Sequence, residues 1–351
     1  MKKVMSSFFI GSLALFLAAC GGSDSTQGNG SASNGEEVAT EQTDSKTIRA
    51  GIGLNNEHPQ YKGLEKFAEL VEERTDGSIV VETYHSGQLG DDRSMMEALQ
   101  LGTQEVTVPS TAPIANFVSE FSVFDFPFLF PSSEVADEVL DGEVGQSFLD
   151  KLEDQNLMGL AYWENGFRNL TNSKQPVATQ EDFQGLTIRT MENDLHLEAF
   201  RALGANPTPM AFTELFTAMQ QGTVDGQENP YATIYLEGYY EVQQHVSNTN
   251  HIYSPFVFMM SKSFFDSLTE EEQEIVSEAA LEAGAYQREL NREANETYLA
   301  NLQEEGMTYT EISEDERQKM VETVQPVIDK YAENIGTEVV EKVYSAIEAA
   351  Q

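Results

Sequence analysis

The sequence predicts an α/β protein built from two units that share one long helix. Strand-like and helix-like segments alternate over residues 47–108, and a second alternating set begins near Leu157. This alternation is typical of parallel sheets with helices on their faces. Helix-favouring sequence over residues 270–305 would reach about 50 Å, which is longer than one small unit. The chain after the N-terminal segment also exceeds the usual size of a single core.

Local signals set the elements of the first unit. Pro59 suits the first turn of a helix, and Gly102 suits the end of one. Residues 79–84 are rich in β-branched side chains and are therefore strand-like. In order, we expect a strand over 47–54, a helix from Gln60, a strand over 79–84, a helix capped by Asp91 or Asp92, and a strand over 106–108.

The second unit has a similar pattern, although the chain has no short internal repeat. Gly204 and Gly222 each end a predicted helix. We expect a hinge between the units at residues 164–166 (Glu-Asn-Gly). In order, we expect a strand from Leu157, a strand over 186–190, a helix over about 195–203 and a helix from Thr213.

A capping box starts the long helix. Thr269 is followed three residues later by Glu272, so each side chain can bind the backbone N–H of the other residue. The helical pattern then runs to about Glu305, with Gly284 as its weak point. Its apolar positions hold no steady heptad, which disfavours a coiled coil. We expect this helix to brace both units.

The first residues are predicted to be a lipoprotein signal peptide rather than part of the fold. Two lysines precede an apolar stretch that is much shorter than the roughly 20 residues needed to span a bilayer. Residues 17–20 (Leu-Ala-Ala-Cys) form a lipobox, so we expect cleavage after residue 19 and lipidation of Cys20. Residues 20–46 are rich in small and polar side chains, and we expect a flexible tether.

The chain is strongly acidic, with 20 basic and 59 acidic residues and a formal net charge of −39. Nucleic acids and anionic membrane surfaces repel such a chain, so neither is expected as a partner. An acidic surface also repels an anionic ligand at long range. Any site for an anion therefore needs its own local donors.

The sequence lacks the motifs of catalysis, cofactor binding and metal binding. Gly51 and Gly53 give only half of a dinucleotide fingerprint, because Asn56 stands where the third glycine would be. The five histidines have no metal-ligand spacing, and the single cysteine, Cys20, excludes disulfides within the chain and thiolate zinc sites. The residues themselves therefore give no sign of catalysis, and no cofactor or metal is expected.

Arg189 is the strongest candidate for binding an anion. The alternating apolar residues beside it point its side chain away from the buried face, near the carboxyl end of a strand, where ligands of open α/β sheets bind. A guanidinium is a planar fork that matches a carboxylate. On position alone, an ion pair with a nearby glutamate is the commoner arrangement, because surface ion pairs are frequent.

Three further residues each allow two interpretations. Arg168 follows the expected hinge and is either a second anion donor or a salt bridge between the units. Asn229 is held extended by Pro230, and its amide serves either a ligand or the backbone of the turn. Phe212 precedes a helix and belongs either to an apolar wall or to the core.

Together these residues resemble the solute-binding proteins of TRAP (tripartite ATP-independent periplasmic) transporters, in the C4-dicarboxylate-binding, DctP-like branch and in a lipoprotein form. The resemblance covers nearly all of the chain after the tether. Its most specific stretches are 202–210 (ALGANPTPM) and 224–230 (VDGQENP). The other stretches are 58–59 (HP), 87–93 (GQLGDDR), 126–130 (FPFLF), 166–168 (GFR) and 185–189 (GLTIR).

The resemblance implies a two-lobed, periplasmic-binding-protein-like (flytrap) fold that closes on its ligand, with the long helix bracing both lobes. It implies that Arg189 pairs with the carboxylate of the ligand and that first-lobe residues contact the distal end. The family members that bind sialic acid look to carry an acidic residue at the position of Ser110. The serine therefore disfavours sialic acid as the ligand of this protein. The ligand-contacting residues that the resemblance implies are Arg189, Arg168, Asn229, Phe212, Asp92 and Ser110.

The function implied by the resemblance is transport. A monomer tethered to the outer face of the cell membrane would capture a small organic-acid anion and deliver it to the small and large subunits of an ion-gradient-driven permease. Lobe I is expected over 47–165 with a contribution from 255–294, and lobe II over 166–254 with one from 295–351. The alternatives are a binding protein for another carboxylate or sugar acid that serves a different transporter or a sensor, and, less favoured, a surface enzyme.

Overall fold

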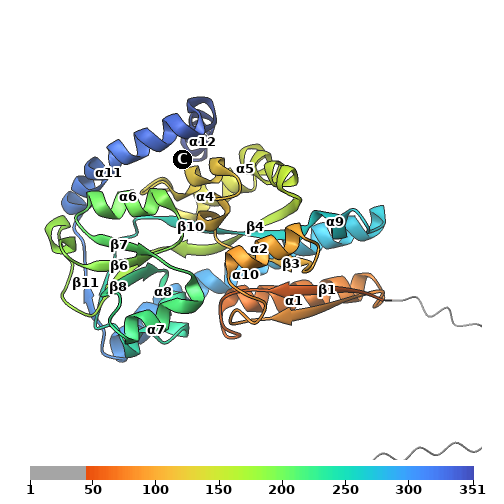
Figure 1. The fold of residues 1–351 in the computed structure, drawn as a ribbon, viewed down its shortest axis with the longest axis horizontal. Coiled ribbons are helices and arrows are strands. Elements are labelled where there is room, and N and C mark those ends of the chain that lie inside the picture. Colours follow the sequence, from red (N-terminus) through yellow and green to blue (C-terminus); the bar gives the residue numbers. More distant parts are fainter. Residues whose placement is uncertain (1–44) are drawn as a thin grey trace, which may run out of the picture. The chain divides into compact units, whose positions relative to one another are not determined.

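Two β-sheets, each packed against helices, form the frame of the protein (Figure 1). The computed structural model describes residues 45–351. The first sheet has the strand order β2-β1-β3-β10-β4, and the second has the order β11-β9-β5-β8-β6-β7. The predicted signal peptide, Cys20 and the tether up to residue 44 lie outside the described residues.

The first sheet combines a parallel half with an antiparallel half. β1 pairs in parallel with β2 and β3, as the β-α-β-α-β pattern predicts, whereas β10 returns from far along the chain and runs antiparallel to β3 and β4. Its strands are β1 (Lys46–Gly51), β2 (Ile79–Tyr84), β3 (Val106–Thr107), β4 (Leu157–Phe167) and β10 (Tyr253–Ser261). Its connecting helices are α1 (Pro59–Arg74) and α2 (Asp92–Gln100).

The second sheet is built from short strands. β6 pairs in parallel with β7 and β8, and β5 pairs antiparallel with β8 and β9. Its strands are β5 (Asn169–Asn172), β6 (Thr187–Thr190), β7 (Asn206–Pro209), β8 (Gly226–Asn229), β9 (His245–Ser247) and β11 (Thr308–Thr310). The helices between them are α6 (Asp194–Ala202), α7 (Leu215–Gln220) and α8 (Tyr231–Leu236).

The remaining helices surround the two sheets. α12 packs on α4 and α5, and α11 packs on α6, so the C-terminal helices reach elements of both halves of the chain (Figure 1). These helices are α3 (Thr111–Ile114), α4 (Ser133–Leu140), α5 (Glu143–Leu149), α9 (Lys262–Phe265), α11 (Glu314–Ile335) and α12 (Thr337–Ala350). Over residues 45–351, none of the helices is both long enough and apolar enough to cross a membrane.

The long helix, α10 (Glu270–Glu304), has the predicted capping box at Thr269 and Glu272. It contacts α1 and β4 of the first half and α8 of the second, as expected of a helix that braces both (Figure 1). Gly284 lets the helix approach β4 closely, because a Cβ at this position would lie 2.6 Å from Cδ1 of Trp163. Trp163 is fully buried and donates its indole N–H to the carbonyl of Ala280, 3.0 Å away.

Two predicted boundaries are wrong by a few residues. The strand expected over 47–54 ends at Gly51, because residues 53 and 54 leave the sheet and turn toward a cavity. The helix expected from Thr213 begins with a 3₁₀ turn over Phe212–Glu214 before α7 starts at Leu215. In both places the chain departs from regular structure where it lines the candidate site.

The expected hinge, residues 164–166, lies inside β4, close to its end. Gly166 has a φ of 110°, which favours glycine. The pairing register with β10 shifts here, so that Ser254 faces Gly166, Pro255 faces Glu164, and Asn165 is left without a partner. This is a β-bulge, and it re-aims the Asn165 side chain.

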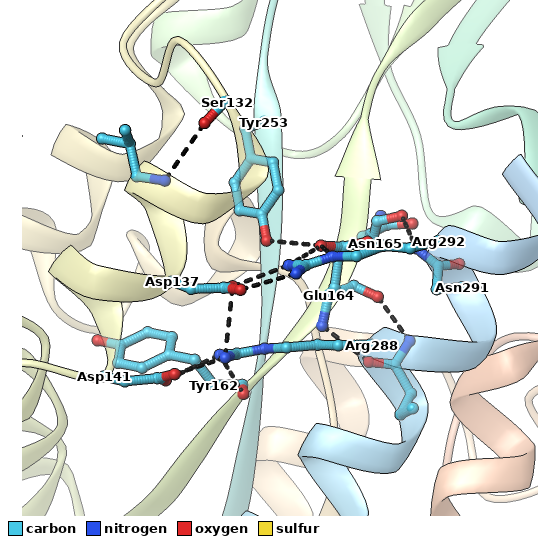
Figure 2. Close-up of polar contacts among 12 residues, drawn as sticks. Ser132, Asp137, Asp141, Tyr162, Glu164, Asn165, Tyr253, Arg288, Asn291 and Arg292 are labelled. Carbon is cyan, nitrogen blue, oxygen red and sulfur yellow. Dashed lines mark hydrogen bonds and ion pairs between the residues drawn. The ribbon is translucent and has the colours of Figure 1, made fainter. Parts of the chain in front are cut away.

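A cluster of five charged residues joins α10 to β4 and α4 beside this bulge (Figure 2). We call it the α10 charge cluster, and its members are Asp137, Asp141, Glu164, Arg288 and Arg292. Arg292 contacts both Glu164 (2.5 Å) and Asp137 (2.8 Å), and Arg288 contacts Asp141 (2.5 Å). Because Glu164 is buried, these contacts hold the strand that carries Asn165 against the long helix.

Candidate functional site

A cavity is lined by residues from both halves of the chain. It holds about 600 Å³ of space between protein atoms, part of which opens to solvent. The first half contributes the loop after β1, the start of α2 and the end of β3, and the second contributes the ends of β6, β7 and β8. The structure brings together in its lining all six ligand-contacting residues implied by the resemblance: Arg189, Arg168, Asn229, Phe212, Asp92 and Ser110.

Arg189 lies in β6, one residue before the end of the strand, and its side chain is buried. Its Nε and Nη2 both donate to the backbone carbonyl of Met210, at 3.0 and 2.7 Å. The third nitrogen, Nη1, is buried and has no partner among the described residues. The Met210 carbonyl therefore fixes one edge of the guanidinium and leaves the edge formed by Nη1 and Nη2 free for a bidentate ligand.

The charge of Arg189 is not neutralised by a glutamate or an aspartate anywhere in residues 45–351. Burial lowers the pKa of Arg189, because desolvation disfavours the charged form. A buried, unpaired guanidinium is costly. A carboxylate at its free edge would remove that cost.

Arg168 differs from Arg189 because it already has a counter-ion. Its Nε lies 2.5 Å from Glu228, which also accepts from Nη2 at 2.8 Å and is fully buried. Burial raises the pKa of Glu228, but Arg168 and His251 together lower it below its usual value. Arg168 lies between the end of β4 and the start of β5, and Glu228 lies in β8, so the pair ties β8 to the segment that connects the two sheets.

Asn229 ends β8 and is buried, with its amide donating to Gln227 at 2.6 Å. Asn165, at the β4 bulge, also lines the cavity. Its side-chain oxygen is buried and accepts no hydrogen bond from the described part of the chain. Figure 2 shows Asn165 next to the α10 charge cluster, where Asn291 donates to its backbone carbonyl at 3.2 Å.

Acidic side chains occupy the first-half wall of the cavity. Asp92 is the first residue of α2, directly after the N-cap Asp91. Burial raises the pKa of Asp92 to about 6; the Ser110 backbone and Arg189 partly offset this, whereas Asp91 and Glu192 raise it further. Ser110 is buried and forms a bridge with Phe256. The Ser110 backbone lies next to the Asp92 carboxylate, because it forms a hydrogen bond with it.

Apolar side chains form the remaining walls. Phe212 is partly buried, lines the cavity and packs at a ring distance of 6.4 Å from Tyr239. It therefore belongs both to a cavity wall and to the edge of a core, and the two sequence-based interpretations are not exclusive. The other apolar lining residues include Leu54, Val108, Met191, Met210 and Phe256.

Hydrogen bonds across the rim join the two halves of the chain. Asn55, in the loop after β1, donates its backbone N–H to Glu237 (2.8 Å) and its amide to the carbonyl of Leu236 (2.6 Å). At another part of the rim, Asn116 donates to the carbonyl of Glu192 at 2.8 Å. These contacts hold the two halves together around the cavity.

The sequence did not indicate that Asn165 and Glu192 line the candidate site or that Glu228 pairs with one of its arginines. Glu228 stands next to Asn229, but its partner Arg168 lies 60 residues away in the chain. Asn165 lay within the expected hinge, where an asparagine before a glycine is also an ordinary turn signal. Within residues 45–351, no group of three or more His, Cys, Asp or Glu side chains could hold a metal ion.

The family of the chain follows from comparison with known proteins. Residues 50–334 match the model of bacterial extracellular solute-binding protein, family 7 (DctP). A solute-binding protein from Verminephrobacter eiseniae is 40% identical over 86% of this chain and 89% of its own length. The C4-dicarboxylate-binding periplasmic protein DctP from Rhodobacter capsulatus is 37% identical over 82% of this chain and 87% of its own length.

Solved structures agree with this assignment. The sugar acid binding protein DctPAm from Advenella mimigardefordensis, in complex with galactonate, superposes with a TM-score of 0.86 and 45% identity. The superposition covers 88% of this chain and 99% of that one. Sequence and two-lobed fold therefore agree, and the chain belongs to the DctP family of extracytoplasmic solute-binding proteins of TRAP transporters.

Proposed function

We propose that this protein captures a small organic-acid anion between its two lobes, with Arg189 binding the carboxylate. The family function is the binding of small organic acids for TRAP transport, not catalysis. The state of its side chain supports the assignment of Arg189 as the carboxylate-binding residue. It is buried, it has an unpartnered nitrogen in the wall of the cavity, and no carboxylate within residues 45–351 neutralises it.

The other lining residues have supporting roles in this proposal. Asn229 donates to the bound acid, and Phe212 packs against its apolar face. Arg168 orients β8 through Glu228 and offers its remaining nitrogen to the ligand. Asp92 and Ser110 contact the end of the ligand away from Arg189. Charge-assisted hydrogen bonds contribute about 1.5–3 kcal/mol each, so one bidentate pair with a few neutral bonds suffices for micromolar affinity.

The two lobes are proposed to be residues 47–165 with 255–294, and residues 166–254 with 295–351. The bulge at Asn165 and the positive φ of Gly166 lie where the chain passes from the first range to the second. Closing the lobes around a ligand excludes water and strengthens the Arg189 contact. The closed protein then delivers the acid to the small and large membrane subunits of its permease.

Membrane attachment is proposed to occur through Cys20. The lipobox at residues 17–20 predicts cleavage and lipidation, which would tether a monomeric binding protein to the outer face of the membrane. Mass spectrometry of the membrane fraction tests this directly. A diacylated N-terminal Cys20 supports the anchor, whereas an intact N-terminus or cleavage at another site refutes it.

Thermal-shift screening against an organic-acid library, followed by calorimetry of each hit, tests the proposed function. We expect at least one carboxylic acid to bind the wild-type protein with micromolar or better affinity. Arg189→Ala should lose this binding, with Kd rising by at least about 100-fold, because no other lining cation is free of a carboxylate partner within residues 45–351. Circular dichroism checks that the variant is folded. Binding of the acid by Arg189→Ala with nearly wild-type affinity refutes the assignment.

A further inference from the structure

We propose that the cavity selects a hydroxylated monocarboxylate of the aldonic-acid type and rejects dicarboxylates, with Asp92 as the discriminating residue. This deepens the proposed function and rests on Arg189 as the site of the ligand's carboxylate. The named relatives do not decide the matter, since one is called a C4-dicarboxylate-binding protein and another is a complex with galactonate.

Few cations of the cavity are available to a ligand. Three arginines line the cavity: Arg93, Arg168 and Arg189. Arg93 is 55% exposed and pairs with Glu97 on the same helix, and Arg168 pairs with the buried Glu228. Of the three, Arg189 alone makes no salt bridge within residues 45–351, so the cavity offers a ligand one buried arginine without a directly bonded carboxylate.

The carboxylates of the cavity lining form a cluster of negative charge around Asp92. Asp91, Asp92 and Glu192 line the cavity, and Asp91 and Glu192 lie near enough to Asp92 to raise its pKa by repulsion. Asp91 is occupied as the N-cap of α2, accepting from the N–H of Ser94 at 2.9 Å. A second carboxylate on the ligand would enter this cluster of negative charge, where like charges destabilise one another.

The polar atoms of the cavity that have no partner within residues 45–351 include hydrogen-bond acceptors. Ionised Asp92 can only accept hydrogen bonds, and the Asn165 side-chain oxygen is a buried acceptor without a partner in the described chain. Acceptors need donors, and a hydroxyl group supplies one. A fully ionised dicarboxylate such as succinate has none. The chain of hydroxyls in an aldonate can therefore donate to acceptors that a dicarboxylate without hydroxyls leaves unsatisfied.

Matched pairs of acids test this selection. D-galactonate and galactarate differ only at the carbon farthest from the shared carboxylate, which carries a hydroxyl in the first and a carboxylate in the second. D-erythronate and meso-tartrate form the same pair with four carbons, and succinate is a dicarboxylate without hydroxyls. Calorimetry at about pH 8 keeps Asp92 ionised, because its pKa is about 6. We expect at least one monocarboxylate to bind at least about tenfold more tightly than its dicarboxylate partner.

Asp92→Asn isolates the residue responsible. The amide keeps the size of the side chain, removes the charge and adds a donor. We expect the affinity for the monocarboxylate to fall and that for the paired dicarboxylate to rise, which changes their ratio by at least about tenfold. Asp194→Asn is the control, because this exposed carboxylate does not line the cavity. Its ratio should stay at the wild-type value.

The outcomes separate this inference from the proposed function. If no carboxylic acid binds, or if binding survives Arg189→Ala, the proposed function itself fails. If an acid binds through Arg189 but is a dicarboxylate, or lacks hydroxyls, the selection proposed here is wrong and the proposed function stands. A ratio that Asp92→Asn leaves unchanged overturns the role of Asp92.

Discussion

In a chain of net charge −39, Arg189 is the candidate site for an anion. The negative surface repels the ligand at a distance, so the attraction must come from a short-range contact in a place that water does not screen. The structure supplies this by burying a guanidinium and fixing its orientation with a backbone carbonyl, that of Met210. A carbonyl orients the cation without neutralising it, which leaves its charge for the ligand.

Arg189→Lys should weaken binding strongly although the charge is kept. A lysine cannot hold the Met210 carbonyl and present two parallel N–H groups to a carboxylate at the same time. Loss of one charge-assisted hydrogen bond of about 1.5–3 kcal/mol predicts a Kd that is about 10–100-fold higher. Calorimetry with an acid that the wild type binds checks this. A change of less than about twofold would show that the fork geometry is unimportant.

The residue scale also shows what a sequence cannot reveal. Position along β6 suggested that Arg189 pairs with a glutamate, and such a pair exists at Arg168 instead, with Glu228. The strand pairing of β5 with β8 decides this, because it brings together two residues 60 positions apart. The resemblance pointed to Arg189, which lines the cavity, whereas Glu228 and Asn165 required the structure.

At the element scale, the best predictions rested on local signals. The bounds of β2, the proline start of α1 and the capping box of α10 are all set by residues within one turn or one strand, and all three are confirmed. The short strands of the second sheet were mostly missed. β5, β8 and β9 have four residues or fewer, and only their long-range pairing defines them.

Gly284 gives a prediction that opposes ordinary helix propensity. In an exposed helix, Gly→Ala adds about 1 kcal/mol of stability. In α10 the added Cβ would lie 2.6 Å from the buried indole of Trp163, so we expect Gly284→Ala to lower the free energy of unfolding by about 1–3 kcal/mol. Chemical denaturation measures this.

The same substitution in a Trp163→Leu background is the control for Gly284→Ala. The smaller side chain leaves room for the Cβ, so the alanine should then be neutral or stabilising. A stabilising Gly284→Ala in the wild-type background would mean that α10 and β4 are not packed as closely as the structure shows.

At the scale of the whole molecule, the proposed opening of the lobes would break hydrogen bonds that join the two halves of the chain at the rim of the cavity. Asn55 donates to Glu237 there, and burial raises the pKa of Glu237 to about 7. If opening returns Glu237 to water, its pKa falls toward the usual value of about 4.3. The closed form then holds a proton that the open form releases.

The sign of the resulting pH effect follows from this difference. A group whose pKa is raised in the closed form favours closure below the lower pKa and loses that contribution as pH rises through the higher one. Affinity for the ligand should therefore fall, by at least about tenfold, between about pH 4.5 and 7, and level off above pH 7. Asp92, with a pKa of about 6, titrates in the same range, so the contribution of Glu237 is the difference between the wild type and a variant whose residue 237 cannot ionise.

Calorimetry across that range, with the wild type and Glu237→Gln, checks the effect. The glutamine still accepts from Asn55 but cannot ionise, so the affinity of this variant should fall less over the range than that of the wild type. An identical slope in both proteins would assign the pH dependence to another group.

The position of the bound carboxylate is the most direct test of the account as a whole. A crystal structure of the complex with an acid found by screening measures the distances from the ligand's carboxylate oxygens to the arginines of the cavity. We predict that two oxygens lie about 2.8 Å from Nη1 and Nη2 of Arg189, while Met210 keeps its contact with the opposite edge. A carboxylate bound instead at Arg93 or at Arg168, with Nη1 of Arg189 still unpartnered, would contradict the account.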